Sequence, residues 1–313
     1  MNTPKAVADE LLALINDRDE IKKALIELGA VVADDDGLSS YPDKIRGLKP
    51  ARLKIFKKEQ FYQWKDKVLP DMEFDESFTS HDMSWLFGRC PNLVAVPNIG
   101  GIETATDISS FIRESSKVTH LTLPDMPMAT KAEGVSMQSG GLTSLTIGDM
   151  PLVETLRNAF RNGDVLEYAS IGDAPKVKDV YCLFYLDSKL KRVKLSLDGG
   201  LITDCKFMFE GCSMLEEVEG VINISSVMDS TESMLSGCAE LKEIRIKGCM
   251  VNISMHQSPK LSLESARFLI SEAQNVSTPK VISLPQSLVD RYPSEMAELG
   301  GVASGKGWTI TYR

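Results

Sequence analysis

Few residues of this sequence could take part in catalysis, and none of them has the spacing of a known catalytic motif. The three histidines are His81, His120 and His256, and the sequence has neither the H-E-x-x-H spacing of zinc proteases nor the G-x-S-x-G turn of serine hydrolases. Residues 300–306 fit a phosphate-binding loop except at its last position, where Gly307 replaces Ser or Thr. This loop follows an expected helix and precedes an expected strand, the reverse of the usual order. A flexible turn is therefore the better interpretation, and the sequence predicts no enzyme activity and no cofactor.

Aspartate recurs at one position in three consecutive stretches, which read PDMP, GDMP and GDAP. The three residues are Asp125, Asp149 and Asp173, each 24 residues after the last. If these stretches stack, the carboxylates form a column along one edge. The favoured interpretation is a corner in which each Asp accepts nearby backbone N–H groups and Pro fixes the direction of the chain. A bound cation is the alternative.

Cysteine usage indicates free thiols in a core. Cys90, Cys212 and Cys238 share one position of a repeat described below, and no C-x-x-C pair occurs. Since Cys packs as a small apolar residue, buried thiols are favoured over disulfides or a metal site. Replacement of Cys212 by Ala is expected to cost about 1 to 2 kcal/mol, and Ser is expected to cost more because its hydroxyl needs a buried partner.

An apolar triplet spaced i, i+3, i+5 recurs every 24 to 26 residues between Met83 and Ile246. Its first positions are Leu93, Val118, Leu142, Leu166, Leu190, Leu215 and Leu241. Another large apolar residue usually lies six positions earlier, so each unit is expected to contain a short helical or turn segment that leads into a short strand. One such unit cannot bury its own apolar face, and stacked copies would form a parallel β ladder.

The period also predicts which strand residues face outward, because alternate residues of a strand point to opposite sides. The candidate binding surface is His120, Thr122, Ser144, Thr146, Tyr168, Ser170, Arg192 and Lys194. From His120 to Tyr168 these residues are small and polar, with one aromatic ring. For Arg192 and Lys194, pairing with the acidic residues of the next strand is favoured over recognition.

The repeat resembles the BspA-like branch of the leucine-rich-repeat superfamily, whose units read roughly F-x-x-C-x-x-L-x-x-[LIV]-x-[LIV]. The best matches are FEGCSMLEEV at 209–218, LSGCAELKEI at 235–244 and FGRCPNLVAV at 87–96. The resemblance implies an α/β repeat fold, a solenoid of about seven units over residues 81–258.

Two flanking regions resemble parts of bacteriophage and prophage tail proteins. Residues 21–48 read IKKALIELGAVVADDDGLSSYPDKIRGL and are similar to a small tail module with the pattern I-x-x-A-I-x-x-K-G-V, a short loop and [ST]-x-[YF]-[PA]-x-K-I-x-x-I. This resemblance makes residues 1–50 an expected helical anchoring module, and residues 51–80 are expected to form a connection and N-terminal cap. Residues 259–313 resemble the terminal segment of phage BspA-like proteins and are expected to form an α/β cap. Its predicted elements are helices at 261–273 and 285–292 and strands at 281–284 and 308–312.

Composition excludes some partners. The 313 residues carry a net charge of −9, which argues against binding to a nucleic-acid backbone. The start of the sequence does not resemble a secretory signal, and no segment has the length and apolar character of a membrane span.

Together these features predict a non-enzymatic virion protein of a tail, baseplate or fibre, made in the host cytoplasm. Residues 1–50 would bind other virion proteins in a homo-oligomeric assembly, and the repeats would bind a host surface protein or glycan. The alternative is a bacterial cell-surface adhesin or interaction module of BspA type.

Overall fold

The structure is a computed structural model and describes residues 53–55, 58, 72–74 and 81–313. The predicted anchoring module over residues 1–50 lies outside the described residues. Of the predicted connection and cap, the structure describes two strands, β1 (Leu53–Ile55) and β2 (Met72–Phe74), which form a two-stranded sheet. None of the helices in the described part of the chain could span a membrane.

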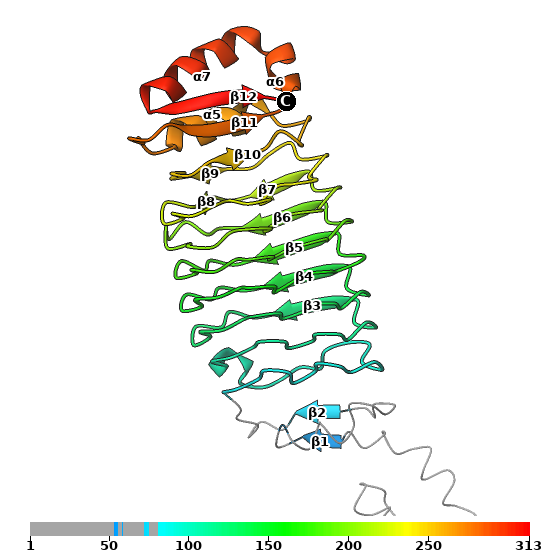
Figure 1. Cartoon of the computed structure of the whole chain (residues 1–313). Helices are drawn as coiled ribbons and strands as arrows, with labels where there is room; N and C mark the ends of the chain where they lie inside the picture. Colours follow the sequence, from blue (N-terminus) through cyan, green and yellow to red (C-terminus); the bar gives the residue numbers. More distant parts are fainter. Residues whose placement is uncertain (1–52, 56–57, 59–71, 75–80) are drawn as a thin grey trace, which may run out of the picture. The chain divides into compact units, whose positions relative to one another are not determined.

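Five short strands form one parallel sheet in the order of the chain (Figure 1). They are β3 (His120–Leu123), β4 (Ser144–Ile147), β5 (Tyr168–Ile171), β6 (Arg192–Leu195) and β7 (Glu217–Glu219). The pairing keeps the predicted register, since His120 lies opposite Ser144 and Arg192 opposite Glu217. The prediction of an α/β fold with parallel strands is confirmed.

The apolar triplets place one side of this sheet in the core. In β3, Leu121 and Leu123 are buried whereas His120 and Thr122 are exposed, and β6 repeats this alternation. Val118, the first residue of the triplet that ends in β3, is fully buried as well. The two-residue period of a strand thus sends the apolar residues inward.

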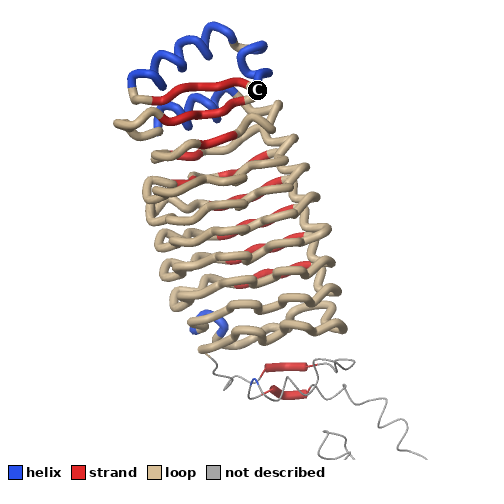
Figure 2. The backbone as a smooth tube through the Cα atoms, viewed as in Figure 1, coloured by secondary structure: helices blue, strands red, loops and turns tan. Residues whose placement is uncertain are grey.

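A second backbone ladder joins the segments that lead into the strands. We call these the turn segments; they are residues 84–89, 109–114, 133–138, 157–162, 181–186, 206–211 and 232–237. At each junction the second, fourth and sixth N–H groups of one turn segment donate to the first, third and fifth carbonyls of the next. Ser110 donates in this way to Glu133, Ile112 to Val135 and Glu114 to Met137. The sequence predicts either a short helix or a turn in each of these segments, and the structure shows that they are turns (Figure 2).

The turn segments repeat an unusual backbone conformation. In each one the second and sixth residues have positive φ, for example Asn158 at 53° and Asn162 at 59°. Asn and Gly adopt this conformation readily, but the same positions also hold Leu186 and Phe207. Their N–H bonds to the neighbouring turn segment offset the strain.

Large apolar residues of the turn segments form the centre of the core. The fourth residues, six positions before each triplet, include Phe160, Phe184 and Phe209, all fully buried. Neighbouring rings in this series are stacked, with centroids 5.2 Å and 5.6 Å apart. All six cysteines are buried and free, which confirms the core position predicted for Cys90, Cys212 and Cys238.

The chain then changes pattern. The short strands β8 (Ile222–Asn223) and β9 (Ile246–Lys247) pair in parallel, and β10 (Ile253–Ser254), β11 (Lys280–Leu284) and β12 (Trp308–Tyr312) form a three-stranded parallel sheet. The helices given bounds by the structure are η2 (Ile102–Thr104), α5 (Leu263–Glu272), α6 (Gln286–Arg291) and α7 (Pro293–Gly305). The elements α5, β11, α6 and β12 lie where the sequence predicted two helices and two strands.

The flexible turn predicted over residues 300–306 is wrong, because α7 runs through Gly300 to Gly305. Met296, Leu299 and Ala303 are buried at helical spacing, and their burial outweighs the low helix propensity of glycine. Lys306 follows the helix, and its ammonium group donates to the carbonyls of Ser271 and Ala273 at the end of α5. The lysine of the phosphate-loop pattern therefore has a structural partner.

Candidate binding surfaces

The structure brings the eight predicted surface residues together on one face of the β3–β7 sheet. His120, Ser144, Tyr168 and Arg192 lie opposite one another in one row, and Thr122, Thr146, Ser170 and Lys194 form the second row. With neighbouring strands about 4.8 Å apart, each row spans about 14 Å. Local alternation in the sequence was sufficient to place them.

Most of this face is neutral and has few internal contacts. Within the first row, His120 contacts the hydroxyl of Thr119 at 2.9 Å, and Tyr168 is 37% exposed. Arg192 forms an ion pair with Glu217 of β7 at 3.2 Å, the cross-strand pairing that the sequence favoured. The neutral rows on β3 to β5 are therefore the part that remains open to a partner.

The aspartate column has a structural role. Asp125 Oδ1 accepts the N–H of Asp149 at 2.9 Å, and Asp149 Oδ1 accepts the N–H of Asp173 at 2.8 Å. These carboxylates fasten one unit to the next, which supports the corner interpretation. Among the described residues, no group of three His, Cys, Asp or Glu side chains could hold a metal ion.

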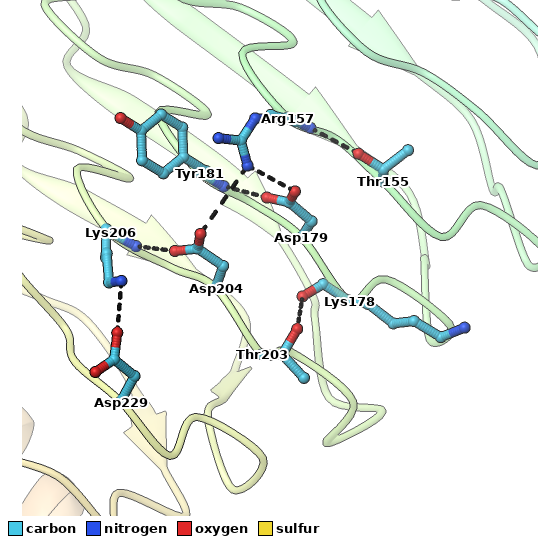
Figure 3. Close-up of polar contacts among 9 residues, drawn as sticks. All are labelled: Thr155, Arg157, Lys178, Asp179, Tyr181, Thr203, Asp204, Lys206 and Asp229. Carbon is cyan, nitrogen blue, oxygen red and sulfur yellow. Dashed lines mark hydrogen bonds and ion pairs between the residues drawn. The ribbon is translucent and has the colours of Figure 1, made fainter.

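Sequence reasoning missed a second surface, formed by polar and aromatic side chains on and beside the turn segments (Figure 3). Arg157 Nη1 lies 2.9 Å from Asp179 Oδ2 and 4.0 Å from Asp204 Oδ2. The Arg157 guanidinium also lies over the ring of Tyr181, 4.1 Å from its centroid. Ionic and ring contacts therefore run across three successive units.

Two aspartates of this surface also shape the backbone. Asp179 Oδ1 accepts the N–H of Tyr181, and Asp204 Oδ1 accepts the N–H of Lys206, in each case two residues ahead. Thr155 makes the same bond to the N–H of Arg157. Side chains that bond two residues ahead favour a turn. The recurrence of Asp, Thr or Ser eleven residues before most triplets was the signal that could have located the turn segments.

The charges of this surface stabilise one another. Burial lowers the pKa of Arg157, but the hydrogen bond and charge of Asp179 outweigh that effect, so its pKa lies above the usual value. The hydrogen bond to Asp229, at 2.7 Å, likewise raises the pKa of Lys206. Both cations therefore stay charged, and the surface offers mixed charges and an aromatic ring to a partner.

The thiols and histidines form no catalytic arrangement in the part of the chain that the structure describes. Burial raises the pKa of the Cys205 and Cys238 thiols to about 12 and that of Cys249 to about 11, so these thiols stay protonated and unreactive. His256 Nδ1 lies 2.6 Å from Ser254 Oγ, but no hydrogen bond within the described residues ties this imidazole to a carboxylate.

No protein-family model matches this chain, and no curated protein matches it.

Proposed function

We propose that the repeats form a BspA-like leucine-rich-repeat solenoid that acts as a non-enzymatic binding module. The observation that carries this proposal is the outward face of β3 to β6. These strands pair in register, so eight outward side chains form two continuous rows. A rigid ladder holds such side chains at fixed spacing, which suits contact with an extended protein or glycan.

The neutral rows on β3 to β5 are the proposed contact area. The hydroxyl groups of Thr122, Ser144, Thr146 and Ser170 can donate and accept hydrogen bonds, and the exposed ring of Tyr168 adds an apolar face. Such a combination suits a host surface glycan or a polar protein surface.

The protein is further proposed to be a virion component of a tail, baseplate or fibre. The resemblance of residues 21–48 to a phage-tail module and of residues 259–313 to a phage terminal segment supports this. Residues 1–50 would then anchor the chain in a homo-oligomeric assembly, and the repeats would contact the host.

Mass spectrometry and cryo-microscopy of particles from the source test the assignment. Finding the chain in particles supports the virion assignment. Finding the chain on cells and not in particles would instead support a cell-surface adhesin. If the chain is in particles, deletion of residues 1–50 is expected to leave a folded protein that no longer incorporates. Incorporation without that segment would contradict the anchoring role.

A second experiment tests the contact area. The double variant Thr146→Glu, Tyr168→Ala should keep the circular dichroism spectrum and lose adsorption to host cells. The same changes made outside the rows, as Thr130→Glu and Tyr292→Ala, form the matched control and should adsorb normally. Normal adsorption of the first variant would move the contact area elsewhere.

A further inference from the structure

The last turn segment, residues 232–237, differs from the others in what its N–H groups meet. At all six junctions between turn segments, three N–H groups find main-chain carbonyls of the next segment. At the sixth junction Phe207 donates to Glu232 at 2.9 Å, Phe209 to Met234 at 2.9 Å and Gly211 to Ser236 at 2.8 Å. The equivalent donors of the last turn segment are Ser233, Leu235 and Gly237.

These donors face a shortened unit. Where residues 232–237 form a six-residue turn, the following unit has a turn of two residues, 256–257. The residues just before this turn form strand β10 (Ile253–Ser254), which pairs with β11. The carbonyls of this extended stretch accept from neither Ser233 nor Leu235. Neither N–H group has a hydrogen-bond acceptor among the residues that the structure describes.

The third donor is satisfied by a side chain. Gln257 Oε1 accepts the N–H of Gly237 at 2.5 Å and the hydroxyl of Ser236 at 3.0 Å. The acceptor is the oxygen of an amide, chemically the same group as a main-chain carbonyl. A side chain therefore takes the place of one of the three main-chain acceptors, and two donors stay open.

A polar groove lies over the open donors. A hollow of about 250 Å³ is lined by Thr231, Ser233, Leu235, Ser236, Ser254, His256 and Gln257. A second hollow, of about 420 Å³, shares Thr231, Ser233 and Ser254 with the first and extends to Asn252 and Arg313. Volumes of this order hold small ligands or short peptide stretches.

We propose that this groove binds a short peptide segment of a partner protein through its main chain. Carbonyls two residues apart in the bound segment accept from Ser233 and Leu235, in the place that the next turn segment fills at the six earlier junctions. Unmade hydrogen bonds of main-chain donors are costly away from water, so a partner that supplies both acceptors is favoured. The proposal does not depend on whether the protein is a virion component.

Other ligand classes match the donors less well. The N-acetyl group of a sugar offers a single amide oxygen, whereas two donors separated by one residue need two acceptors held at main-chain spacing. Free anions meet both Glu232 and Arg313 in the lining of the second hollow, so the two charges offset each other and give an anion little net attraction. A peptide satisfies the spacing without adding charge.

The test uses nuclear magnetic resonance of the full chain labelled with ¹⁵N. The probe is an acetylated and amidated peptide that copies residues 231–238 with the change Cys238→Ser, because this segment already supplies the acceptors to residues 207–211. The main-chain carbonyls of the peptide should accept from the N–H groups of Ser233 and Leu235. The amide signals of these two residues should therefore shift as peptide is added and saturate with a dissociation constant of about 1 mM or lower. N-acetylglucosamine disaccharide, acetate and phosphate are the comparison probes.

Two variants make the result specific. Gln257→Ala frees the third donor, so the peptide should bind several-fold more tightly and the Gly237 signal should join the response. Ser254→Trp fills the groove and should weaken binding about tenfold or more, whereas Ser116→Trp, on an exposed turn of an earlier unit, should leave it unchanged.

The proposal is overturned if the peptide shifts neither amide, if the disaccharide or an anion shifts them and the peptide does not, or if Gln257→Ala weakens binding. Gln257→Ala keeps the test decisive should Ser254→Trp fail to fold.

Discussion

Asp187 occupies a position at which other units carry Cys, Ser or Gly. Its side chain is fully buried; Oδ1 accepts the N–H of Gly163, and Oδ2 has no hydrogen-bond partner among the described residues. Burial raises the pKa of Asp187 well above its usual value; the Gly163 N–H lowers it, and the nearby Asp164 carboxylate raises it. Cys212 is a further titratable neighbour. Ser115 and Ser139, at the same position of other units, donate to main-chain carbonyls at 2.6 Å.

The raised pKa makes stability depend on pH. Folded Asp187 holds its proton more tightly than the unfolded carboxyl, whose pKa is about 3.9, so its stabilising contribution is complete below about pH 4 and is lost as the pH rises towards the folded pKa. Asp187→Ser should therefore raise the free energy of unfolding at about pH 8 by about 1 to 3 kcal/mol and reduce its pH dependence. Urea unfolding at two pH values measures both effects.

Asp173→Ser, a change at an exposed carboxylate, is the control and should show little pH-dependent effect. An Asp187→Ser variant less stable than the parent at the higher pH would show that the charged form is accommodated.

The buried thiols reverse one expectation from the sequence. Serine was expected to cost more than alanine at Cys212 for want of a buried partner, but Cys212 Sγ lies 3.0 Å from the Phe184 carbonyl. Ser115 and Ser139, at the same position of other units, donate to the carbonyls of Phe87 and Ile112 at 2.6 Å each. The acceptor needed by serine is therefore built into the repeat.

Cys212→Ser should consequently cost less stability than Cys212→Ala, which loses both packing and the donor and should cost about 1 to 2 kcal/mol. Denaturant midpoints of the two variants decide the order. Alanine as the better replacement would restore the expectation drawn from the sequence.

At the scale of the element, close approach of neighbouring units fixes residues that no helix or strand pattern specifies. A Cβ added to Gly148 would overlap Asp125 Oδ1 and lie 2.5 Å from the Asp125 nitrogen, and Gly172 meets Asp149 in the same way. These glycines allow the aspartate column to form its hydrogen bonds.

Gly148→Ala should therefore destabilise the protein by about 2 kcal/mol or more, because the overlapping atoms are backbone as well as side chain. Gly300→Ala is the matched control: a Cβ there meets nothing within 4 Å, and alanine in helix α7 should add about 0.5 to 1 kcal/mol. Thermal unfolding of both variants measures the contrast. Equal unfolding temperatures for the two variants would show that neighbouring units can move apart to fit a Cβ at Gly148 without loss of stability.

The sequence predicted the strands in detail, but for the turn segments it predicted only a short helical or turn segment, for a physical reason. In each strand, buried apolar residues such as Leu121 and Leu123 alternate with polar residues. This two-residue period shows which face of the strand is buried and how neighbouring strands align. In the turn segments, positive φ at residues such as Leu186 and Phe207 depends on hydrogen bonds to the next unit, which no local propensity encodes. For the same reason the surface around Arg157 and Tyr181 was missed, while the rows on β3 to β6 were found.

At the scale of the whole molecule, each unit of the β3–β7 sheet pairs with the units beside it. Removal of residues 142–165, one period of 24, would leave Leu166 in place of Leu142 and bring β3 against β5 in register. This variant should fold, with the parent's circular dichroism per residue and a lower free energy of unfolding. A deletion of half that length, residues 142–153, is the control and should not fold cooperatively. If the half-unit deletion folded and the whole-unit deletion did not, the strand register could not depend on whole units.

The stacking of units through backbone bonds also determines how the repeats bear load. If the first and last units were pulled apart, force would act on one boundary between units at a time, because the bonds of Phe207, Phe209 and Gly211 to the next turn segment share nothing with those of other junctions. Each rupture would release about 24 residues, or about 80 Å of extended chain at roughly 3.3 to 3.6 Å per residue. The repeats would yield in even steps, each absorbing work while the remaining units stay folded.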